Sequence, residues 1–183
     1  MNWRWRTFVW VACLWLAIGC DSSDRAKTPS PAPTNAEPRV TAFGYLDRAQ
    51  PKLTTLRVWL GPQELTTELA LTDVQRMTGM MYRTNMTDQE AMLFVFNYPS
   101  QQAFYMRNTK VPLSAAYVDS EGVIREIVDL HPLNETAVPS VSDQIQYVLE
   151  VPQGWFKRKN IGAGTIIRTE RGTLAQTFFT PRR

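Results

Sequence analysis

Residues 91–96 read Ala-Met-Leu-Phe-Val-Phe, a continuous apolar run that Tyr98-Pro99-Ser100 closes. The length of this run suits a buried β-strand better than a helix. On its amino-terminal side, apolar side chains alternate over residues 56–60, Gly61-Pro62 turns the chain, and residues 65–71 fit a returning strand. The run and this hairpin predict a domain built around a β-sheet.

The region after the apolar run continues as short strands separated by turns. The expected strands cover residues 103–106, 115–118, 123–128, 145–151 and 165–168. Short helices are expected at the capping box of Thr72 and Gln75, for one turn at the similar pair Thr87 and Glu90, and at residues 154–160. The sequence therefore predicts a single compact domain, mainly β or α+β, in which short, mostly antiparallel strands form a barrel-like sheet with two or three short helices.

The first 19 residues have the organisation of a secretory signal peptide. Arg4 and Arg6 give a charged start, every residue from 8 to 18 is apolar, and Gly19 precedes Cys20. An apolar run of about 11 residues is too short for a permanent membrane span, which needs about 20. We therefore expect the protein to be exported and the signal, residues 1–19, to be removed.

The end of the signal resembles a bacterial lipobox, since residues 16–20 read Leu-Ala-Ile-Gly-Cys. That resemblance implies a diacylglyceryl group on Cys20, which becomes the first residue of the mature protein. A lipid also explains why a single cysteine remains once Cys13 has left with the signal. We expect a membrane-anchored lipoprotein of the bacterial cell envelope that faces the periplasm or the cell surface. Plain secretion and an uncleaved anchor are the alternatives.

Residues 20–41 are expected to tether the domain to the membrane. Four prolines stand there among Ser, Thr, Asn, Ala and charged residues, so little of the segment can be buried. A proline-rich linker is semi-extended, and at about 3 Å per residue it reaches roughly 60 Å. The globular domain is expected over residues 42–183.

The charge of the mature chain argues against a nucleic-acid partner. The full chain has 20 basic and 17 acidic residues, and loss of Arg4 and Arg6 leaves 18 basic residues against 17 acidic ones. A nearly neutral domain lacks the basic surface that binds phosphates. We therefore expect no nucleic acid among its partners.

Three stretches of the domain, read in order, resemble a known family. They are residues 75–83 (Gln-Arg-Met-Thr-Gly-Met-Met-Tyr-Arg), residues 91–96, and residues 104–109 (Phe-Tyr-Met-Arg-Asn-Thr) followed by Pro112-Leu113. These stretches resemble the signatures of domain of unknown function 192, a group of small, often exported bacterial and archaeal proteins. The resemblance covers about residues 53–168. It implies a fold and a cleft rather than a reaction.

The chain departs from the pattern of this family at four positions. Ala91 replaces a glycine, Tyr105 replaces a tryptophan and Arg107 replaces a lysine, and the last two keep the chemical type. Ser114 stands where the family commonly has an aspartate. Any family mechanism that uses this acid lacks it in this chain.

The chain has few residues that could bind a metal ion or act as an activated nucleophile. The mature chain has one histidine, His131, and one cysteine, whereas a zinc site needs three or four ligands. It has no Gly-x-Ser-x-Gly elbow and no phosphate-binding glycine motif. The methionines between residues 77 and 106 fit flexible core filling better than a soft-metal site. We expect no metal and no cofactor.

The best candidates for a ligand site are cations beside aromatic and polar side chains. They are Arg76, Arg83, Tyr105, Arg107, Asn108 and Thr109, together with Glu150. A guanidinium offers a planar fork to a carboxylate or phosphate, and an aromatic ring beside an amide suits a sugar or peptide. These residues predict a cleft for a small anionic or glycan ligand. In the competing structural interpretation, Arg83 and Arg107 pair with Glu150 or Asp119.

Three functions agree with this set of residues. The leading prediction is a non-catalytic binding or accessory module of the envelope, because the chain has few nucleophiles. The second is an envelope hydrolase that uses a carboxylate, and it predicts an acid buried in the cleft with a raised pKa. The third is a module that docks on another envelope protein through the apolar segment 174–179, which otherwise fits an extra edge strand.

Overall fold

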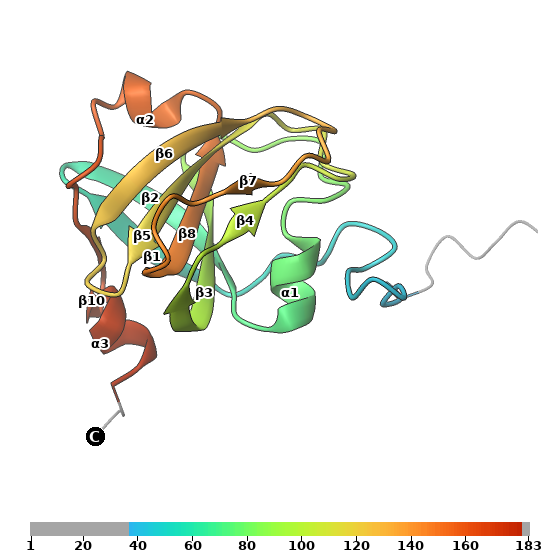
Figure 1. Cartoon of the computed structure of the whole chain (residues 1–183), viewed down its shortest axis with the longest axis horizontal. Helices are drawn as coiled ribbons and strands as arrows, with labels where there is room; N and C mark the ends of the chain where they lie inside the picture. The colour runs from blue at the N-terminus through green and yellow to red at the C-terminus, as the bar shows by residue number, and fades with distance from the viewer. Residues whose placement is uncertain (1–36, 181–183) are drawn as a thin grey trace, which may run out of the picture. The chain divides into compact units, whose positions relative to one another are not determined.

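The structure is a computed structural model that describes residues 37–180, and one large sheet is its main element (Figure 1). The predicted signal peptide, Cys20 and most of the predicted tether lie outside the described residues. None of the helices between residues 37 and 180 has the length and hydrophobicity of a transmembrane span.

Within the described part of the chain, the large sheet has eight strands in the order β10-β9-β1-β2-β3-β8-β5-β6. They are β1 (Thr55–Leu60), β2 (Gln63–Ala70), β3 (Glu90–Ser100), β5 (Leu113–Asp119), β6 (Ile124–Leu130), β8 (Ile145–Pro152), β9 (Ile167–Thr169) and β10 (Gly172–Thr173). A small sheet pairs β4 (Ala103–Phe104) with β7 (Val138–Pro139). The same residues form three short helices, α1 (Asp73–Thr78), α2 (Trp155–Arg158) and α3 (Leu174–Phe178).

The predicted fold class is confirmed, with a correction to the barrel-like arrangement. All pairings in the large sheet are antiparallel except that of β2 with β3. The sheet bends back on itself without closing into a barrel: the residues just before β6 and just before β9 meet at an isolated bridge, Val123 with Ile166, and not along a ladder of strands. Strand β9 has three residues and already pairs with β1 and β10, so no continuous ladder can form between β9 and β6.

Two local predictions are wrong for physical reasons. Thr87 and Glu90 do not begin a helix: the Thr87 N–H donates to the Glu90 carboxylate at 2.9 Å, and β3 starts at Glu90. The segment 174–179 is not an edge strand, because Thr173 and Gln176 form a capping box that starts α3. The capping box of Thr72 and Gln75 at the start of α1 is present as predicted.

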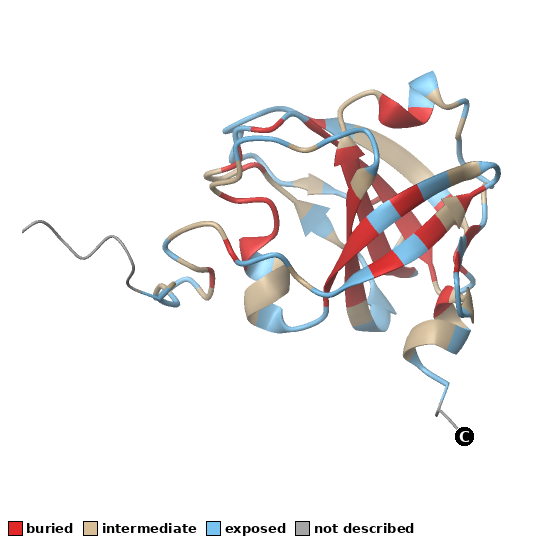
Figure 2. Ribbon diagram, turned by 180° about the vertical axis from the view of Figure 1, so that it is seen from behind, coloured by how far each residue is buried: buried red, intermediate tan, exposed pale blue. Residues whose placement is uncertain are grey.

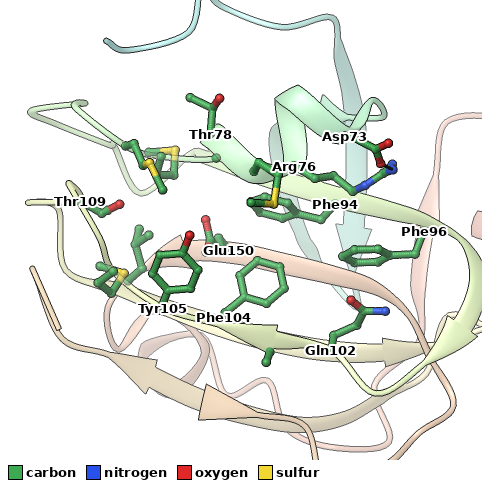
Figure 3. A pocket seen from close by; sticks show the side chains of 17 residues that line it. Asp73, Arg76, Thr78, Phe94, Phe96, Gln102, Phe104, Tyr105, Thr109 and Glu150 are labelled. Carbon is green, nitrogen blue, oxygen red and sulfur yellow. Dashed lines mark hydrogen bonds and ion pairs between the residues drawn. The ribbon is translucent and has the colours of Figure 1, made fainter. Parts of the chain in front are cut away.

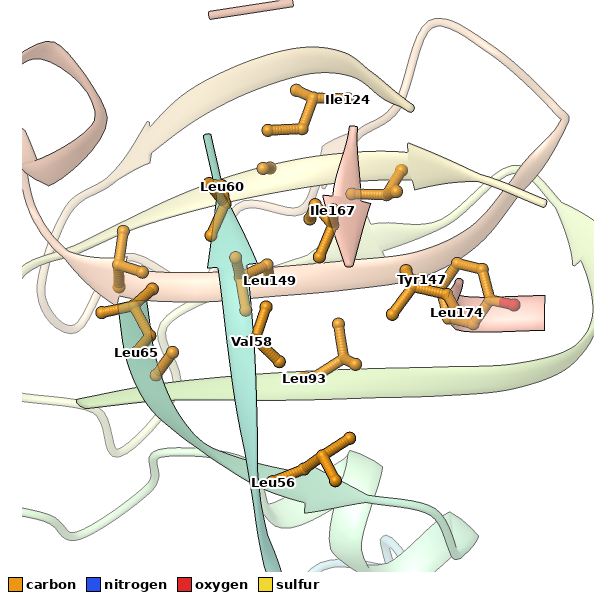
Figure 4. Close-up of a cluster of buried hydrophobic side chains, with 14 of the residues drawn as sticks. Leu56, Val58, Leu60, Leu65, Leu93, Ile124, Tyr147, Leu149, Ile167 and Leu174 are labelled. Carbon is orange, nitrogen blue, oxygen red and sulfur yellow. The ribbon is translucent and has the colours of Figure 1, made fainter. Parts of the chain in front are cut away.

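The hydrophobic core consists of two clusters, one on each face of the sheet. Side chains alternate between the faces of a strand, so Leu93 of β3 lies in the first cluster and its neighbours Met92 and Phe94 lie in the second. The first cluster is the larger and includes Leu174 of α3 (Figure 4). Buried residues follow the strands of the large sheet, as Figure 2 shows. Strand β8 is buried on both faces.

Candidate functional site

A pocket of about 370 Å³ opens next to the second core cluster (Figure 3). Its apolar wall includes four aromatic rings and four thioethers: Phe94, Phe96, Phe104, Tyr105, Met77, Met80, Met81 and Met106. These residues come from α1 and the turn after it, from β3, and from β4 and the segment that follows it. A concave, mostly apolar site with few polar groups is the usual form of a small-molecule pocket.

Glu150 is the acid inside this pocket. It lies in the middle of β8, in register with Met92 of β3 and Ala115 of β5, and only 4% of it is exposed. Because Leu149 and Val151 face the first core cluster, Glu150 faces the second. Figure 3 shows its carboxyl among the rings that line the pocket.

The carboxyl of Glu150 is unusual because no protein group balances it. Within residues 37–180 its Oε2 atom is buried and has no hydrogen-bond partner. Burial disfavours the charged form and raises the pKa of Glu150 to about 8, so the group is mainly protonated at neutral pH. A buried polar atom without a partner costs about 1–3 kcal/mol, which calls for a functional explanation.

Helix α1 places Arg76 at the rim of the pocket. The helix approaches β3 closely at Gly79, which has a φ of 46° and where a Cβ atom would lie 3.3 Å from the Phe94 ring. The Arg76 guanidinium donates to the carbonyl of Val95 at 2.8 Å and to the Asp73 carboxylate at 2.5 Å. It lies over the Phe96 ring and points toward Asp73, away from Glu150 (Figure 3). Arg76 therefore joins α1 to β3.

Arg83 and Arg107 form ion pairs outside this pocket, and their partners differ from the predicted ones. Arg83 makes two hydrogen bonds to Glu68 of β2, at 2.6 and 2.8 Å. Arg107 binds Glu135 at 2.7 and 2.9 Å and lies over the Tyr105 ring. The prediction that they pair with Glu150 or Asp119 is wrong, because Asp119 pairs with Arg125 of β6 and Glu150 faces the pocket.

The Glu68–Arg83 pair shows how this protein stabilises a buried carboxylate. Burial acts to raise the pKa of Glu68, but the hydrogen bonds from Arg83 and from the Leu53 N–H outweigh it and hold the pKa below its usual value. Arg83 and Glu68 line a second, more polar cavity of about 420 Å³. Met80 lines both cavities.

Asn108 and Thr109 shape the turn beside the pocket. Asn108 has a φ of 55°, and its side-chain amide donates to the Tyr82 hydroxyl at 2.8 Å. The Thr109 hydroxyl donates to the carbonyl of Arg107 at 3.2 Å. The pocket is lined by Thr109, but not by Asn108.

The structure thus brings four of the seven predicted site residues to one pocket. Arg76, Tyr105, Thr109 and Glu150 line it, whereas Arg83, Arg107 and Asn108 do not. The phenylalanine and methionine lining was not predicted as a site, although the density of methionines between residues 77 and 106 was a usable signal. Ser114 also lies elsewhere: its hydroxyl donates to Asp129 and accepts a hydrogen bond from the Gly154 N–H.

Comparisons with known proteins give a family and a fold. The family model of domain of unknown function 192, described as an uncharacterized ACR, matches residues 57–169. A solved structure from Sinorhizobium meliloti 1021, provisionally named a transcription regulator, is 31% identical with a TM-score of 0.63, and the match covers 66% of this chain and 98% of that one.

A second solved structure, a protein of unknown function from Novosphingobium aromaticivorans DSM 12444, is 28% identical with a TM-score of 0.57. The match covers 73% of this chain and 94% of that one. Comparison with curated proteins gave no match. Since the family model spans most of the sheet and of the pocket wall, this chain belongs to the family of domain of unknown function 192.

Proposed function

We propose that this domain binds a small, mostly apolar molecule whose one polar group is received by Glu150. The observation that carries the proposal is a buried glutamate at the pocket wall whose Oε2 has no protein partner in the described residues. We further propose that the protein acts as a binding or accessory module of the bacterial cell envelope, held on the membrane by a lipid on Cys20.

The chemistry of the pocket supports an apolar ligand. Rings and thioethers line a volume that suits a molecule of about ten to fifteen heavy atoms. Thioethers adapt to ligand shape because they have several rotatable bonds and a polarisable sulfur. A polar, extended glycan would find few hydrogen-bond partners on this wall.

An anionic ligand has less support than the sequence suggested. Arg76 and Arg107 already bind carboxylates, and Arg83 lies in the other cavity with Glu68. An anion beside Glu150 would also meet an acid rather than a cation. The charge of the chain does not support DNA binding, which the provisional name of the Sinorhizobium protein suggests, because residues 20–183 have 18 basic and 17 acidic residues.

A thermal-shift experiment tests the pocket. The mature chain, residues 20–183 with Cys20→Ser, is heated with 4-phenylbutanol, 4-phenylbutylamine or 4-phenylbutyrate, which share one apolar body. A bound probe at ten times its Kd adds about 1.4 kcal/mol, or about 3–6 °C in Tm. Ala103→Trp places a large ring at the pocket and should abolish the shift, whereas Ala137→Trp, at an exposed residue outside the pocket lining, should keep it. An unchanged Tm with all three probes would contradict the proposal.

Catalysis by Glu150 is the second candidate function. A carboxyl with a pKa of about 8 is suited to proton transfer near neutral pH. Among the described residues, the other acid on the wall of this pocket is Asp73, which is exposed and paired with Arg76. Turnover of chromogenic esters or glycosides by the wild type and not by Glu150→Gln would favour a hydrolase over a binding module.

A further inference from the structure

We propose that the polar group received by Glu150 is a cation, an amine or ammonium carried on an apolar ligand. This inference rests on the proposed function of the same pocket and narrows its ligand class. It follows from three features of the pocket: its aromatic walls, its charge balance, and the contrast between Glu150 and the other buried glutamate of the sheet, Glu68.

The walls present aromatic rings to any group that approaches Glu150. Phe94 and Phe104 meet edge to face with ring centroids 4.9 Å apart, and Phe96 and Tyr105 complete the aromatic lining. The face of an aromatic ring carries partial negative charge and attracts ammonium groups, with an energy of about 0.5–2 kcal/mol per contact. Sulfur atoms from four methionines add polarisable contacts. Rings around a carboxyl form a site for a cation.

The pocket lining itself supplies no cation to Glu150. Arg76 is the only basic residue of the described chain that lines the pocket, and its guanidinium is bound to Asp73 and to main-chain carbonyls. A ligand cation would therefore meet an acid that no protein group has neutralised. A ligand cation would give an ionised Glu150 the ion-pair partner that no described residue provides.

Glu68 shows how a cationic partner changes the ionisation of a buried glutamate in this sheet. Both glutamates are buried in the sheet, at 8% exposure for Glu68 and 4% for Glu150. Glu68 has Arg83 within 2.6 Å, and its pKa lies below the usual value, whereas Glu150 lacks a cation and its pKa rises to about 8. A bound amine would pair with Glu150 and favour its ionised form, as Arg83 does for Glu68.

Binding of a cation should release the proton of Glu150. The other titratable side chains around it are Asp73 and Arg76 of α1 and Tyr105 on the pocket wall, with Tyr117 of β5 in the adjoining cluster. With a pKa of about 8, roughly 0.9 of the Glu150 carboxyls carry a proton at pH 7. The affinity for an amine should therefore rise about tenfold from pH 6 to pH 7 and level off above pH 8.

Titration calorimetry on the mature chain with Cys20→Ser tests this inference. The probes are 4-phenylbutylamine, 4-phenylbutanol and 4-phenylbutyrate, each measured in phosphate and in Tris at pH 7. We expect the amine to bind at least tenfold more tightly than the alcohol and the anion to bind most weakly. The difference in heat between the two buffers should correspond to release of about 0.9 proton per bound amine.

The Glu150→Gln variant keeps the shape of the side chain but cannot ionise, so it should lose both the preference for the amine and the proton release. If the wild type binds the alcohol as tightly as the amine, the inference that the ligand carries a cation is wrong, whereas the proposed apolar pocket still stands. Absence of binding by every probe would overturn both. The comparison of the three probes uses only the wild type, so it tests the inference even if the Glu150→Gln variant folds poorly.

Discussion

At the scale of one residue, the fold keeps a carboxyl where it costs stability. Glu150 lies on β8, an inner strand of an eight-stranded sheet, and its neighbours along the strand, Leu149 and Val151, are buried. Replacing buried charged groups by uncharged ones of similar volume is often neutral or stabilising. A side chain that costs folding free energy and supports no other group is best explained by its action on a ligand.

Burial of the Glu150 carboxyl without a partner predicts an unusual pH dependence of the stability. The pKa of Glu150 rises from 4.5 to about 8 on folding, so between these values the folded state holds a proton that the unfolded state has lost. Stability should therefore fall as pH rises through this window, by up to about 1.4 kcal/mol per pH unit. Glu150→Gln should remove most of this decline and be the more stable protein at pH 8.

Urea unfolding of the two proteins at pH 5, 6, 7 and 8 measures this difference. The Glu68–Arg83 pair does not interfere, because a lowered pKa makes its stabilisation disappear only at more acidic pH. Parallel pH profiles for wild type and variant would show that Glu150 is already ionised in the folded state.

At the scale of elements, Arg83 joins the turn after α1 to β2. Its partner Glu68 is buried, so Arg83→Met should leave an unpaired carboxylate and lower the free energy of unfolding by about 3 kcal/mol. Arg107→Met is the matched control, because the side chains of Arg107 and Glu135 are 34% and 56% exposed, so solvent screens the pair and its loss should cost much less. Urea denaturation measures both, and equal losses would contradict this assignment.

Elements whose signal is local could be predicted from the sequence. The hairpin of β1 and β2, the buried strand β3 and the cap of α1 each depend on neighbouring residues. Helix α3 was missed although Thr173 and Gln176 repeat that cap, because an apolar segment as short as residues 174–179 also fits a strand.

The site was predictable only in part, because ion pairing depends on which elements lie side by side. The sequence offered several acids to Arg83, and the pairing of β2 with its neighbours selects Glu68. Likewise, Glu150 is one polar residue in an alternating strand, and no local pattern shows that every cation stays out of its reach. Tertiary packing, rather than sequence spacing, distinguishes a paired glutamate from an unpaired one.

At the scale of the whole molecule, the predicted lipid suits the proposed ligand. Apolar amines partition into bilayers, and a tether of roughly 60 Å would keep the domain close to that reservoir. Two acyl chains of a diacylglyceryl group anchor a protein stably, since each buried CH₂ contributes about 0.8 kcal/mol and one chain alone binds only reversibly.

The proposed lipid anchor predicts how the protein distributes in the cell. In the bacterium, the wild type should sediment with membranes, and mass spectrometry should find its first peptide beginning at an acylated Cys20. Cys20→Ser should move the protein to the soluble exported fraction or leave the signal uncleaved, and Cys13→Ser should change nothing, because that residue leaves with the signal. A wild type found unmodified in the soluble fraction would argue for plain secretion. A membrane-bound wild type with an intact, unacylated signal would instead show that residues 8–18 anchor the chain, despite being short for a span.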